Sequence, residues 1–343
     1  MSELVENENQ ATGYTVTLGS ETLEQHDAKG LESIMIQDHE EKIGVCFLSI
    51  GHGELDFESF KEGDDVKVEV DGSDDPLFQG VITGIRHTWK GGKEYCNIQA
   101  MDPLIKLAAT TDTKSYNDES QTQSDDQIVK EVLSDASVDA GTIDTSTVKR
   151  ETTRMNESAL TFIKRLAARN GYIVDSSGGK INFRKPQSSD PAVEIPPEQL
   201  MSFDSTKDAS MIPKTVKVIG FDYMENKVVQ GEFSSSDVTK VGGGDAPSST
   251  IFGGTHYVTG VRVTTDDAAK AMAQSIMEKA AKGMMKGKAA IQGNGTVSSN
   301  TKLKFTGMNE GFNAEVTVVS TTHTIDDGGF KTTIQFRGNT APK

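Results

Sequence analysis

The sequence lacks the short motifs with which many enzymes hold phosphate, metal ions or acyl intermediates. Its 343 residues contain no GxSxG, GxxxxGK[ST] or GxGxxG pattern, and its histidines form no HExxH pair. The triplet Gly242-Gly243-Gly244 does not lead directly into a helix N-terminus, so phosphate binding there is not expected. We therefore predict no catalytic, cofactor-binding or metal-binding residues. The histidines are His26, His39, His52, His87, His256 and His323.

Carboxylates, by contrast, are too abundant to be informative. With 51 Asp and Glu residues, any two could be drawn as the acid pair of a glycosidase. Asp56, Glu58 and Asp102 are of the kind that more often serves in turns and on surfaces. His323 stands in the middle of an expected strand between threonines, where packing or a satisfied hydrogen bond accounts for it.

Cysteines and long apolar runs are also scarce. Cys46 and Cys96 cannot staple a chain of this size and have no CxxC spacing. We expect buried free thiols in a reducing compartment, although the sequence leaves open whether the two pair. The acidic start has no apolar core of a secretion signal, and no run approaches the roughly 18 apolar residues that cross a bilayer. A soluble protein made in the cytoplasm, without a membrane segment, is expected.

Positive charge is nearly absent from the first quarter of the chain. Residues 1–79 hold 20 acidic and 4 basic side chains, whereas the remainder holds 31 of each sign, so the net charge of -16 arises in that quarter. Such a field repels nucleic acid, and specific DNA or RNA binding is not expected. A solvated acidic face is the favoured interpretation. The alternative is a surface that something must slide past without sticking.

The first 111 residues predict a small β-barrel. Residues 1–12 have the composition of a disordered polar tail. From Tyr14 onward, short strands follow one another between Gly-containing turns, which favours a sandwich or a closed barrel over residues 13–111. Closing the sheet also removes exposed strand edges. The expected strands lie near residues 14–18, 34–36, 43–50, 66–70, 77–85 and 95–100.

Residues 112–197 predict a compact α+β module. Ser124 and Gln127 form a capping box ahead of an apolar helix face. A second helix is expected to begin near Asn156 and to end at Gly171. A hairpin follows, with its turn at residues 176–179. The proline-rich residues 186–197 are interpreted as the link onward.

Residues 198–235 and 288–343 predict a second β-barrel, interrupted by a loop and helix at residues 236–287. Strands are expected at residues 215–221 and 227–233, and a helix from about Asp266 to Lys282, capped by Thr264. Small side chains on one helix face indicate close packing against a neighbour. That face comprises Ala269, Met272, Ala273, Ile276 and Ala280.

The clearest pattern in the chain is the meander at residues 303–337. Its third strand alternates Phe330, Thr332, Ile334 and Phe336 after a Gly-rich turn, as a half-buried antiparallel strand does. Two β blocks of similar size hint at an internal duplication, although no fixed sequence period is visible. The predicted fold class is therefore α+β and mainly β, with two tube-type antiparallel β-barrels, a small α+β module and an interrupting helix.

Two further clusters allow a structural and a functional interpretation. Lys164, Arg165 and Arg169 lie on one expected helix, where they either complement its dipole or form a protein-contact patch. Met284 and Met285 follow the last helix and serve either as core filler or, if exposed, as an adaptable contact.

Four segments, in order, resemble the phage late control D proteins, the tail baseplate hub family. They are FKEGDDV, LFQGVI and IQAMDPL within residues 60–104, NESALTFIKRLAARNGYIVDSSGGKINF at 156–183, VKVIGFDYMENKVVQG at 216–231, and the helix and meander of residues 264–337. The resemblance spans nearly the entire chain. It is shared with the N-terminal hub part of type VI secretion spikes and with the hubs of contractile injection systems.

The resemblance implies a homotrimer in which each chain supplies two barrels, so that a threefold ring meets a quasi-sixfold tube. It further implies assembly, after synthesis in the bacterial cytoplasm, into the baseplate of a virion tail or injection particle. The implied partners are a spike or tip protein, an inner tube protein or tube initiator, other baseplate proteins, and tape measure or effector cargo. Because the chain shows no OB-like domain, β-helical repeat or lysozyme-like insertion, the tip is expected to be a separate protein. Part of the acidic excess is expected to line the lumen.

Other functions stay open at this point. A tail-associated protein that binds or hydrolyses peptidoglycan would use residues 112–190, but no acid pair or nucleophile stands out. A carbohydrate-binding β-sandwich would display exposed aromatic residues, and one Trp and six Tyr are a poor signal for that. The sequence does not distinguish a phage tail from a bacteriocin or an injection machine.

Overall fold

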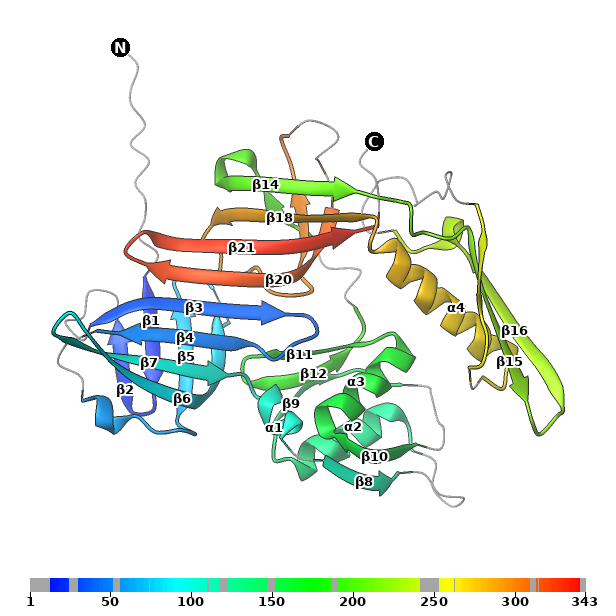
Figure 1. The fold of residues 1–343 in the computed structure, drawn as a ribbon, viewed down its shortest axis with the longest axis horizontal. Helices are drawn as coiled ribbons and strands as arrows, with labels where there is room; N and C mark the ends of the chain where they lie inside the picture. Colours follow the sequence, from blue (N-terminus) through cyan, green and yellow to red (C-terminus); the bar gives the residue numbers. More distant parts are fainter. Residues whose placement is uncertain are drawn as a thin grey trace, which may run out of the picture.

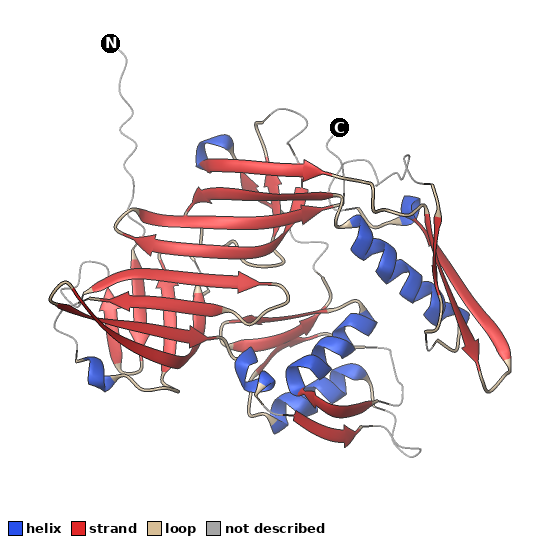
Figure 2. Ribbon diagram, in the orientation of Figure 1, coloured by secondary structure: helices blue, strands red, loops and turns tan. Residues whose placement is uncertain are grey.

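A large curved sheet dominates the molecule. An α+β module lies beside the lower part of the sheet. An arm of strands and one helix projects from the upper part of the sheet, at the right in the view of Figures 1 and 2. The chain is α+β and mainly β, as the sequence predicted. The expected tail at residues 1–12 lies outside the described residues. The computed structural model describes residues 13–24, 30–51, 56–73, 75–109, 111–116, 123–146, 152–186, 191–240, 253–261, 263–308, 313 and 315–339.

The first half of the sheet encloses its own apolar core. Strand alternation directs one side of every strand inward, as with Ile34 and Ile36 on β3. Cys46 and Cys96 are buried free thiols on neighbouring strands, and burial raises the pKa of Cys96 to about 11. The strands are β1 (Tyr14–Leu18), β2 (Glu21–Glu24), β3 (Leu31–His39), β4 (Val45–Ile50), β5 (Asp65–Val70), β6 (Phe78–Lys90) and β7 (Lys93–Met101), with a 3₁₀ turn η1 (Phe57–Ser59).

The α+β module follows the predicted signals closely. The capping box of Ser124 and Gln127 is present, and Gly171 ends α3 with a left-handed φ of 68°. The expected helix start near Asn156 is wrong, because Asn156 lies in β10 and the Ser158 hydroxyl caps α3 by accepting from the Thr161 N–H. The elements are α1 (Leu104–Ala108), β8 (Thr111–Ser115), α2 (Asp125–Asp135), β9 (Ala140–Ile143), β10 (Thr153–Ser158), α3 (Ala159–Asn170), β11 (Ile173–Ser177) and β12 (Lys180–Arg184).

The second half of the sheet contains the predicted meander, in which β20 pairs antiparallel with both β19 and β21. The segment expected to be a linker also contributes a strand, β13, which pairs in parallel with β19 and buries Ile195. Three residues are too short for a periodic signal, so only the contact with β19 defines this strand. The elements are β13 (Val193–Ile195), η2 (Pro197–Gln199), β14 (Leu200–Lys207), β18 (Met285–Gln292), β19 (Lys302–Phe305), β20 (Glu315–Asp326) and β21 (Gly329–Gly338).

The arm corrects the expected second barrel. The strands predicted at residues 215–233 do not join the large sheet; among the described residues they form a sheet of their own with β17. Its apolar face, with Val216, Val218 and Val229, packs on α4 and gives the arm a separate core (Figure 1). Met284 lies in this core, while Met285 lies in that of the second half, so both are core filler. The elements are β15 (Thr215–Asp222), β16 (Lys227–Ser234), η3 (Ser235–Asp237), β17 (Thr255–Val258) and α4 (Asp266–Ala281).

Small side chains let α4 approach the arm sheet closely, as expected. A Cβ at Gly231 would lie 2.1 Å from the backbone nitrogen of Lys270. The cap differs from expectation, because Thr265 rather than Thr264 accepts the Ala268 N–H. The fully buried residues of the helix are Ala269, Ala273, Met277 and Ala281, so Met277 and Ala281 take the place expected for Ala280.

The Gly231→Ala variant tests this close approach. The added methyl group must push α4 away from β16, which we expect to lower the free energy of unfolding by about 1–3 kcal/mol. Gly253→Ala is the matched control, since a Cβ there meets nothing within 4 Å and should change stability by less than about 0.5 kcal/mol. Urea denaturation measures both. Equal stabilities of the two variants would contradict the packing argument.

Backbone pairing of β3 with β20 joins the two halves into one continuous sheet. The antiparallel register runs from Ile325 opposite Ile34 to Ser320 opposite His39. We call this contact the in-chain seam. At its end the Glu40 N–H donates to the Val319 carbonyl at 3.0 Å. The Arg337 guanidinium also pairs with the half-buried Glu40 carboxylate at 2.7 Å, and so fixes the end of the seam.

Candidate functional site

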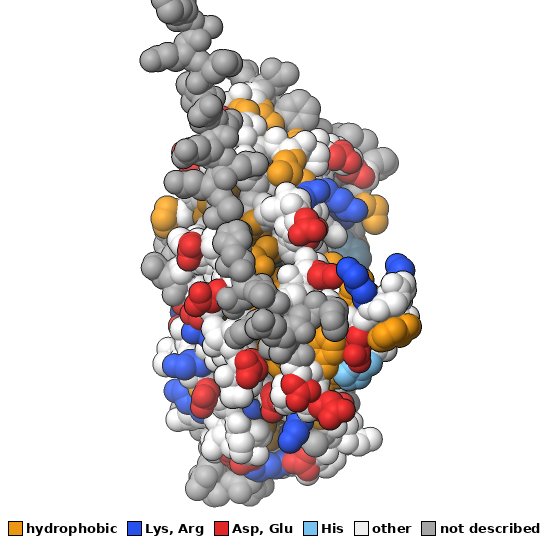
Figure 3. Space-filling view, turned by 90° about the vertical axis from the view of Figure 1, so that its left-hand side faces the viewer, with side chains coloured by type: hydrophobic (Ala, Val, Ile, Leu, Met, Phe, Trp, Pro, Cys, Tyr) orange, Lys and Arg blue, Asp and Glu red, His pale blue; other side chains and the backbone are white. Residues whose placement is uncertain are grey.

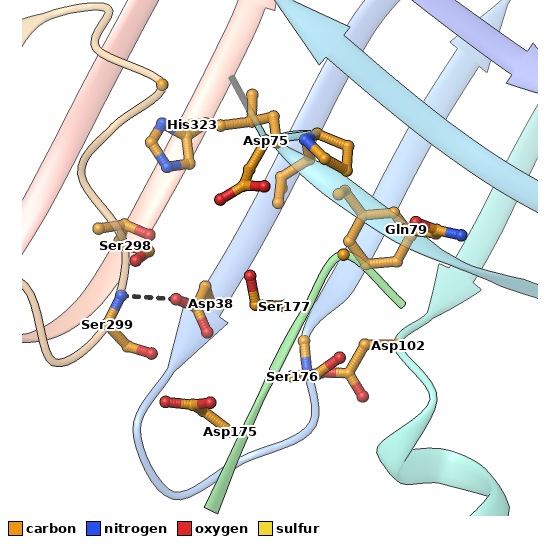
Figure 4. A pocket seen from close by; sticks show the side chains of 18 of the residues that line it. Asp38, Asp75, Gln79, Asp102, Asp175, Ser176, Ser177, Ser298, Ser299 and His323 are labelled. Carbon is orange, nitrogen blue, oxygen red and sulfur yellow. Dashed lines mark hydrogen bonds between the residues drawn. The ribbon is translucent and has the colours of Figure 1, made fainter. Parts of the chain in front are cut away.

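A cleft of about 350 Å³ lies where both halves of the sheet meet the α+β module (Figure 4). The turn before β6, the β11–β12 hairpin and residues 295–299 border it. Carboxylates from several elements gather here, so this cleft is where an acid–base site would be sought. Its titratable lining comprises Asp38, Asp75, Asp102, Asp175, Arg184 and His323.

The carboxylates Asp38 and Asp175 are already occupied by contacts that hold the fold. The Ser299 N–H donates to Asp38 at 2.6 Å and thereby ties the β18–β19 connection to β3. Asp175 accepts from Arg184 at 2.6 Å and from Asn182 at 2.8 Å within the β11–β12 hairpin. Each carboxylate has donors of its own, as buried charged groups require.

His323 is a structural histidine, as the sequence predicted. It is 3% exposed, and its Nδ1 and Nε2 atoms lie 3.0 Å from the Thr332 hydroxyl and 3.1 Å from the Val297 carbonyl. Burial lowers its pKa to about 4, so the ring is neutral at pH 7. With both nitrogens engaged, it does not serve as a general base.

Asp102 connects the wall of the sheet to the α+β module. It follows β7 directly and accepts the Gly44 N–H at 2.7 Å and the Leu104 N–H at 2.9 Å, the latter at the start of α1. The side chain is buried, and this burial raises its pKa to about 7 against the opposing effect of the two backbone donors. Asp102 is therefore a buried junction residue and not a surface group, although its bond to the Leu104 N–H is a turn contact of the expected kind.

The pKa of Asp102 predicts a pH-dependent junction. Because the folded-state pKa lies above the unfolded one, the native state favours the proton, and its stability falls as pH rises from about 4 to 7. Asp102→Asn removes this titration, so its stability should change less across that window, by on the order of 1–3 kcal/mol. Thermal unfolding of both proteins between pH 4 and 8 measures the difference. Parallel curves would contradict it.

The remaining candidate residues do not assemble into a site. His39, His87 and His256 lie on three different strands, and no group of three metal-ligating side chains occurs among the described residues. Asp56 caps η1 by accepting the Glu58 N–H, a turn role that was expected. His26, His52 and the triplet 242–244 lie outside the described residues. None of the helices in the described part of the chain is long and apolar enough to span a membrane.

The basic cluster on α3 is engaged within the chain. Lys164 donates to the Glu41 carbonyl at 2.6 Å, which ties α3 to the turn after β3. Arg165 pairs with Glu157, and Arg169 pairs with the buried Asp125. The cluster therefore stabilises the α+β module and its attachment to the turn after β3. Because all three cations have partners within the chain, a role as a protein-contact patch is not favoured.

A wall with a repeated strand order is the most distinctive feature of the structure. In the described part of the chain, eight consecutive strands run in the order β14-β18-β21-β20-β3-β4-β7-β6 (Figure 1). We call these strands the wall. The order β3-β4-β7-β6-β5 in the first half repeats as β14-β18-β21-β20-β19 in the second. We call these sets unit 1 and unit 2.

The two units match residue by residue. The hairpin β6–β7 has a two-residue turn and a bulge between Ile82 and Gly84, and the hairpin β20–β21 has the same turn length and a bulge between Val318 and Ser320. The pair β3–β4 is irregular after Leu31. Its counterpart β14–β18 is irregular after Leu200. Bulges at equivalent positions fix the same register twice.

The face of the wall that points away from the two cores is mainly polar and carries basic side chains, with an apolar strip of Met35, Val45 and Phe47 across β3 and β4. Strand alternation and register place Gln37, Ser49, Asn97, Gln99, Thr322 and Thr324 there, with Arg86, Asp204, Lys286, Lys288 and Lys331. The acidic side chains described between residues 13 and 79 lie mainly on β2, β5 and turns, so the acidic excess does not line this face. Figure 3 shows Asp and Glu scattered, among Lys and Arg, over the end where the two long hairpins turn.

The wall ends in two edges to which no described strand is paired. β14 is the terminal strand of the sheet at one end. At the other end, β6 pairs with β5 only through residues 78–81, and its residues 83–90 have no strand on that side in the described part of the chain. Sequence reasoning missed these edges, because an edge is defined by the absence of a neighbour and not by any residue type.

Solved structures with the same fold come from phage tails and secretion machines. A 43 kDa tail protein of prophage MuSo2 from Shewanella oneidensis superposes with a TM-score of 0.72 at 13% identity, covering 94% of this chain and 98% of that one. A tail protein of Neisseria meningitidis MC58 gives 0.71 at 11% identity, with 96% and 97% covered. An E. coli component of the type VI secretion system gives 0.62 at 12% identity, with 94% and 76% covered.

These likenesses confirm the sequence-based resemblance at the level of the fold. The neighbours are tail proteins and a secretion-system component, and their fold accommodates nearly all of this chain. Comparison with curated protein sequences gave no match. A family model described as the Alg8 N-terminal domain matches residues 9–327, and the chain therefore belongs to that family.

Proposed function

We propose that this protein is the structural hub of a contractile tail or injection-system baseplate, and that three copies form a ring through which cargo passes. The wall carries this proposal. One chain builds the same five-stranded unit twice, and within the described residues it leaves one strand edge open at each end. A closed ring of identical copies covers both of these wall edges at once.

Duplication suits an adaptor between symmetries. Two similar units per chain give six similar units in a ring of three chains. Such a ring presents six near-equivalent units to a sixfold inner tube, while the α+β modules and arms, present once per chain, keep threefold symmetry for a spike. The partners on the two sides are then an inner tube protein or tube initiator and a separate spike or tip protein, with other baseplate proteins around them.

The polar face of the wall is proposed to line the bore. Hydroxyl and amide side chains make up much of it, Met35, Val45 and Phe47 form an apolar strip near its centre, and Lys286, Lys288 and Lys331 add positive charge. Most of the side chains that a passing tape measure or effector protein would meet on this face are therefore polar. This replaces the acidic lumen expected from the sequence. The particle, whether a virion tail or an injection machine, is the proposed location.

A tail-associated protein that binds or hydrolyses peptidoglycan is the alternative. It would use the carboxylate-lined cleft, but Asp38, Asp102 and Asp175 accept hydrogen bonds from the chain itself. The structural neighbours are tail proteins and not enzymes. We therefore propose a non-catalytic role. Clearing of a peptidoglycan zymogram by the purified protein would contradict it.

Mass measurement tests the ring directly. Light scattering of the purified chain should give about 111 kDa, three times the 36.9 kDa of one chain. Assembly through strand edges depends on concentration, so dilution should shift the mass towards one chain. The ring proposal is contradicted by a mass of one or two chains at every concentration tested, and supported by a trimer that recruits a distinct spike protein.

A further inference from the structure

We infer that the ring closes through a defined strand pairing, in which residues 84–89 of β6 in one copy run antiparallel to residues 203–208, on and just after β14, of the next copy. The inference rests on the proposed ring and names its contact. The occupant of each open edge is thus a second copy of this chain. The predicted opposite pairs are Gly84–Asp208, Ile85–Lys207, Arg86–Thr206, His87–Ser205, Thr88–Asp204 and Trp89–Phe203.

The in-chain seam supplies the template for this contact. There, β20 of unit 2 pairs with β3 of unit 1. The counterpart of β20 in unit 1 is β6, and the counterpart of β3 in unit 2 is β14. These counterparts are the two strands at the ends of the wall whose outer edges are paired with no described strand. The contact that the chain makes once internally is therefore available a second time, between copies.

Equivalent positions then fix the register. Counting from the matched bulges, Ser320 corresponds to Gly84 on the hairpin side. On the partner side, Ser33 corresponds to Ser202, so His39 corresponds to Asp208. The seam pairs Ser320 with His39, and its counterpart therefore pairs Gly84 with Asp208. A register shifted by one residue would turn every side chain to the wrong face.

Equivalent side chains on β20 and β6 differ in exposure, since β20 has β3 beside it and β6 has no described strand at the same place. Ile325 lies in the seam and is 6% exposed, whereas its counterpart Trp89 is 73% exposed. His323 is buried, whereas its counterpart His87 has half of its side chain in solvent. Ile325 joins the core that contains Ile34 on the neighbouring β3, and His323 is covered in addition by Val297, whereas no described strand lies beside Trp89 and His87 on that side. A large exposed aromatic side chain at such an edge is typical of an interface.

Side chains across the proposed contact suit each other. Trp89 would lie opposite Phe203, which is half-buried beside Phe305 and Phe336 and continues the apolar core of unit 2. Arg86 would lie diagonal to Asp204 on the polar face, within reach of a long side chain. The proposed contact between copies thus joins core to core on one face and opposite charges on the other.

Disulfide trapping tests the register. In the Thr88→Cys/Asp204→Cys variant, mild oxidation should link neighbouring copies, giving bands at two and three chain masses on a non-reducing gel. Met35→Cys/Thr324→Cys is the matched control, since these residues are opposite in the in-chain seam and their bond leaves the mass of one chain. Thr88→Cys/Ser205→Cys is the off-register control, with thiols on opposite faces, and should not link.

The outcomes separate the contact from the ring. A trimer by light scattering in which the in-chain control closes but residues 88 and 204 do not link overturns the register and leaves the ring standing. A protein that stays monomeric at all concentrations overturns both. Links at residues 88 and 204 between copies, absent from the off-register control, support the contact.

Charge reversal gives an independent test on a protein with its native thiols. Arg86→Glu places two acids diagonal to each other across the contact and should raise the dissociation constant of the ring about fivefold. Arg86→Glu/Asp204→Arg should restore it. The chain has one Trp, so burial of Trp89 should shift its fluorescence to shorter wavelength on assembly. The contact is contradicted if the double variant dissociates as readily as the single one, or if the fluorescence spectrum of Trp89 does not change in a proven trimer.

Discussion

The backbone hydrogen bonds between β3 and β20 are the interaction on which the rest of the structure depends. They convert two five-stranded units into a single wall and place the cleft, the Glu40–Arg337 ion pair and the α+β module around the junction. Strand pairing is suited to this task because it satisfies backbone polar groups along a whole edge and tolerates wide variation in side chains. The same property explains why a second contact of this kind is available at the ends of the wall.

The two units share a geometry with little sequence likeness. A few equivalent positions hold the same residue, such as Ile98 and Ile334 or Gln99 and Gln335, while most differ. What the units share is the turn length, the positions of the bulges and the alternation of buried and open faces. These features set the register, and the register sets which side chains meet. Equivalent histidines, His87 and His323, differ in exposure because their neighbours differ.

Charged side chains at the junctions between elements hold the parts of the fold together. Asp102 spans the junction of wall and module, Asp38 ties the β18–β19 connection to β3, and Lys164 ties α3 to the turn after β3. Each uses a charged group to satisfy backbone donors or acceptors between elements that are distant in the sequence. This is the chemistry of a scaffold whose parts must keep their positions.

Local signals in the sequence determined the elements that depend on neighbours along the chain. The capping box at Ser124, the Gly171 stop and the meander of residues 303–337 follow from hydrogen bonds and alternation within a few residues, so they could be predicted. Only the tertiary structure decided where β13 pairs, that β15 and β16 leave the large sheet for α4, and that unit 1 recurs as unit 2. These features depend on which distant strand covers which edge, and the backbone hydrogen bonds that pair strands depend little on side-chain identity. The open edges of β6 and β14 could not be predicted either, because the absence of a neighbouring strand leaves no pattern in the sequence.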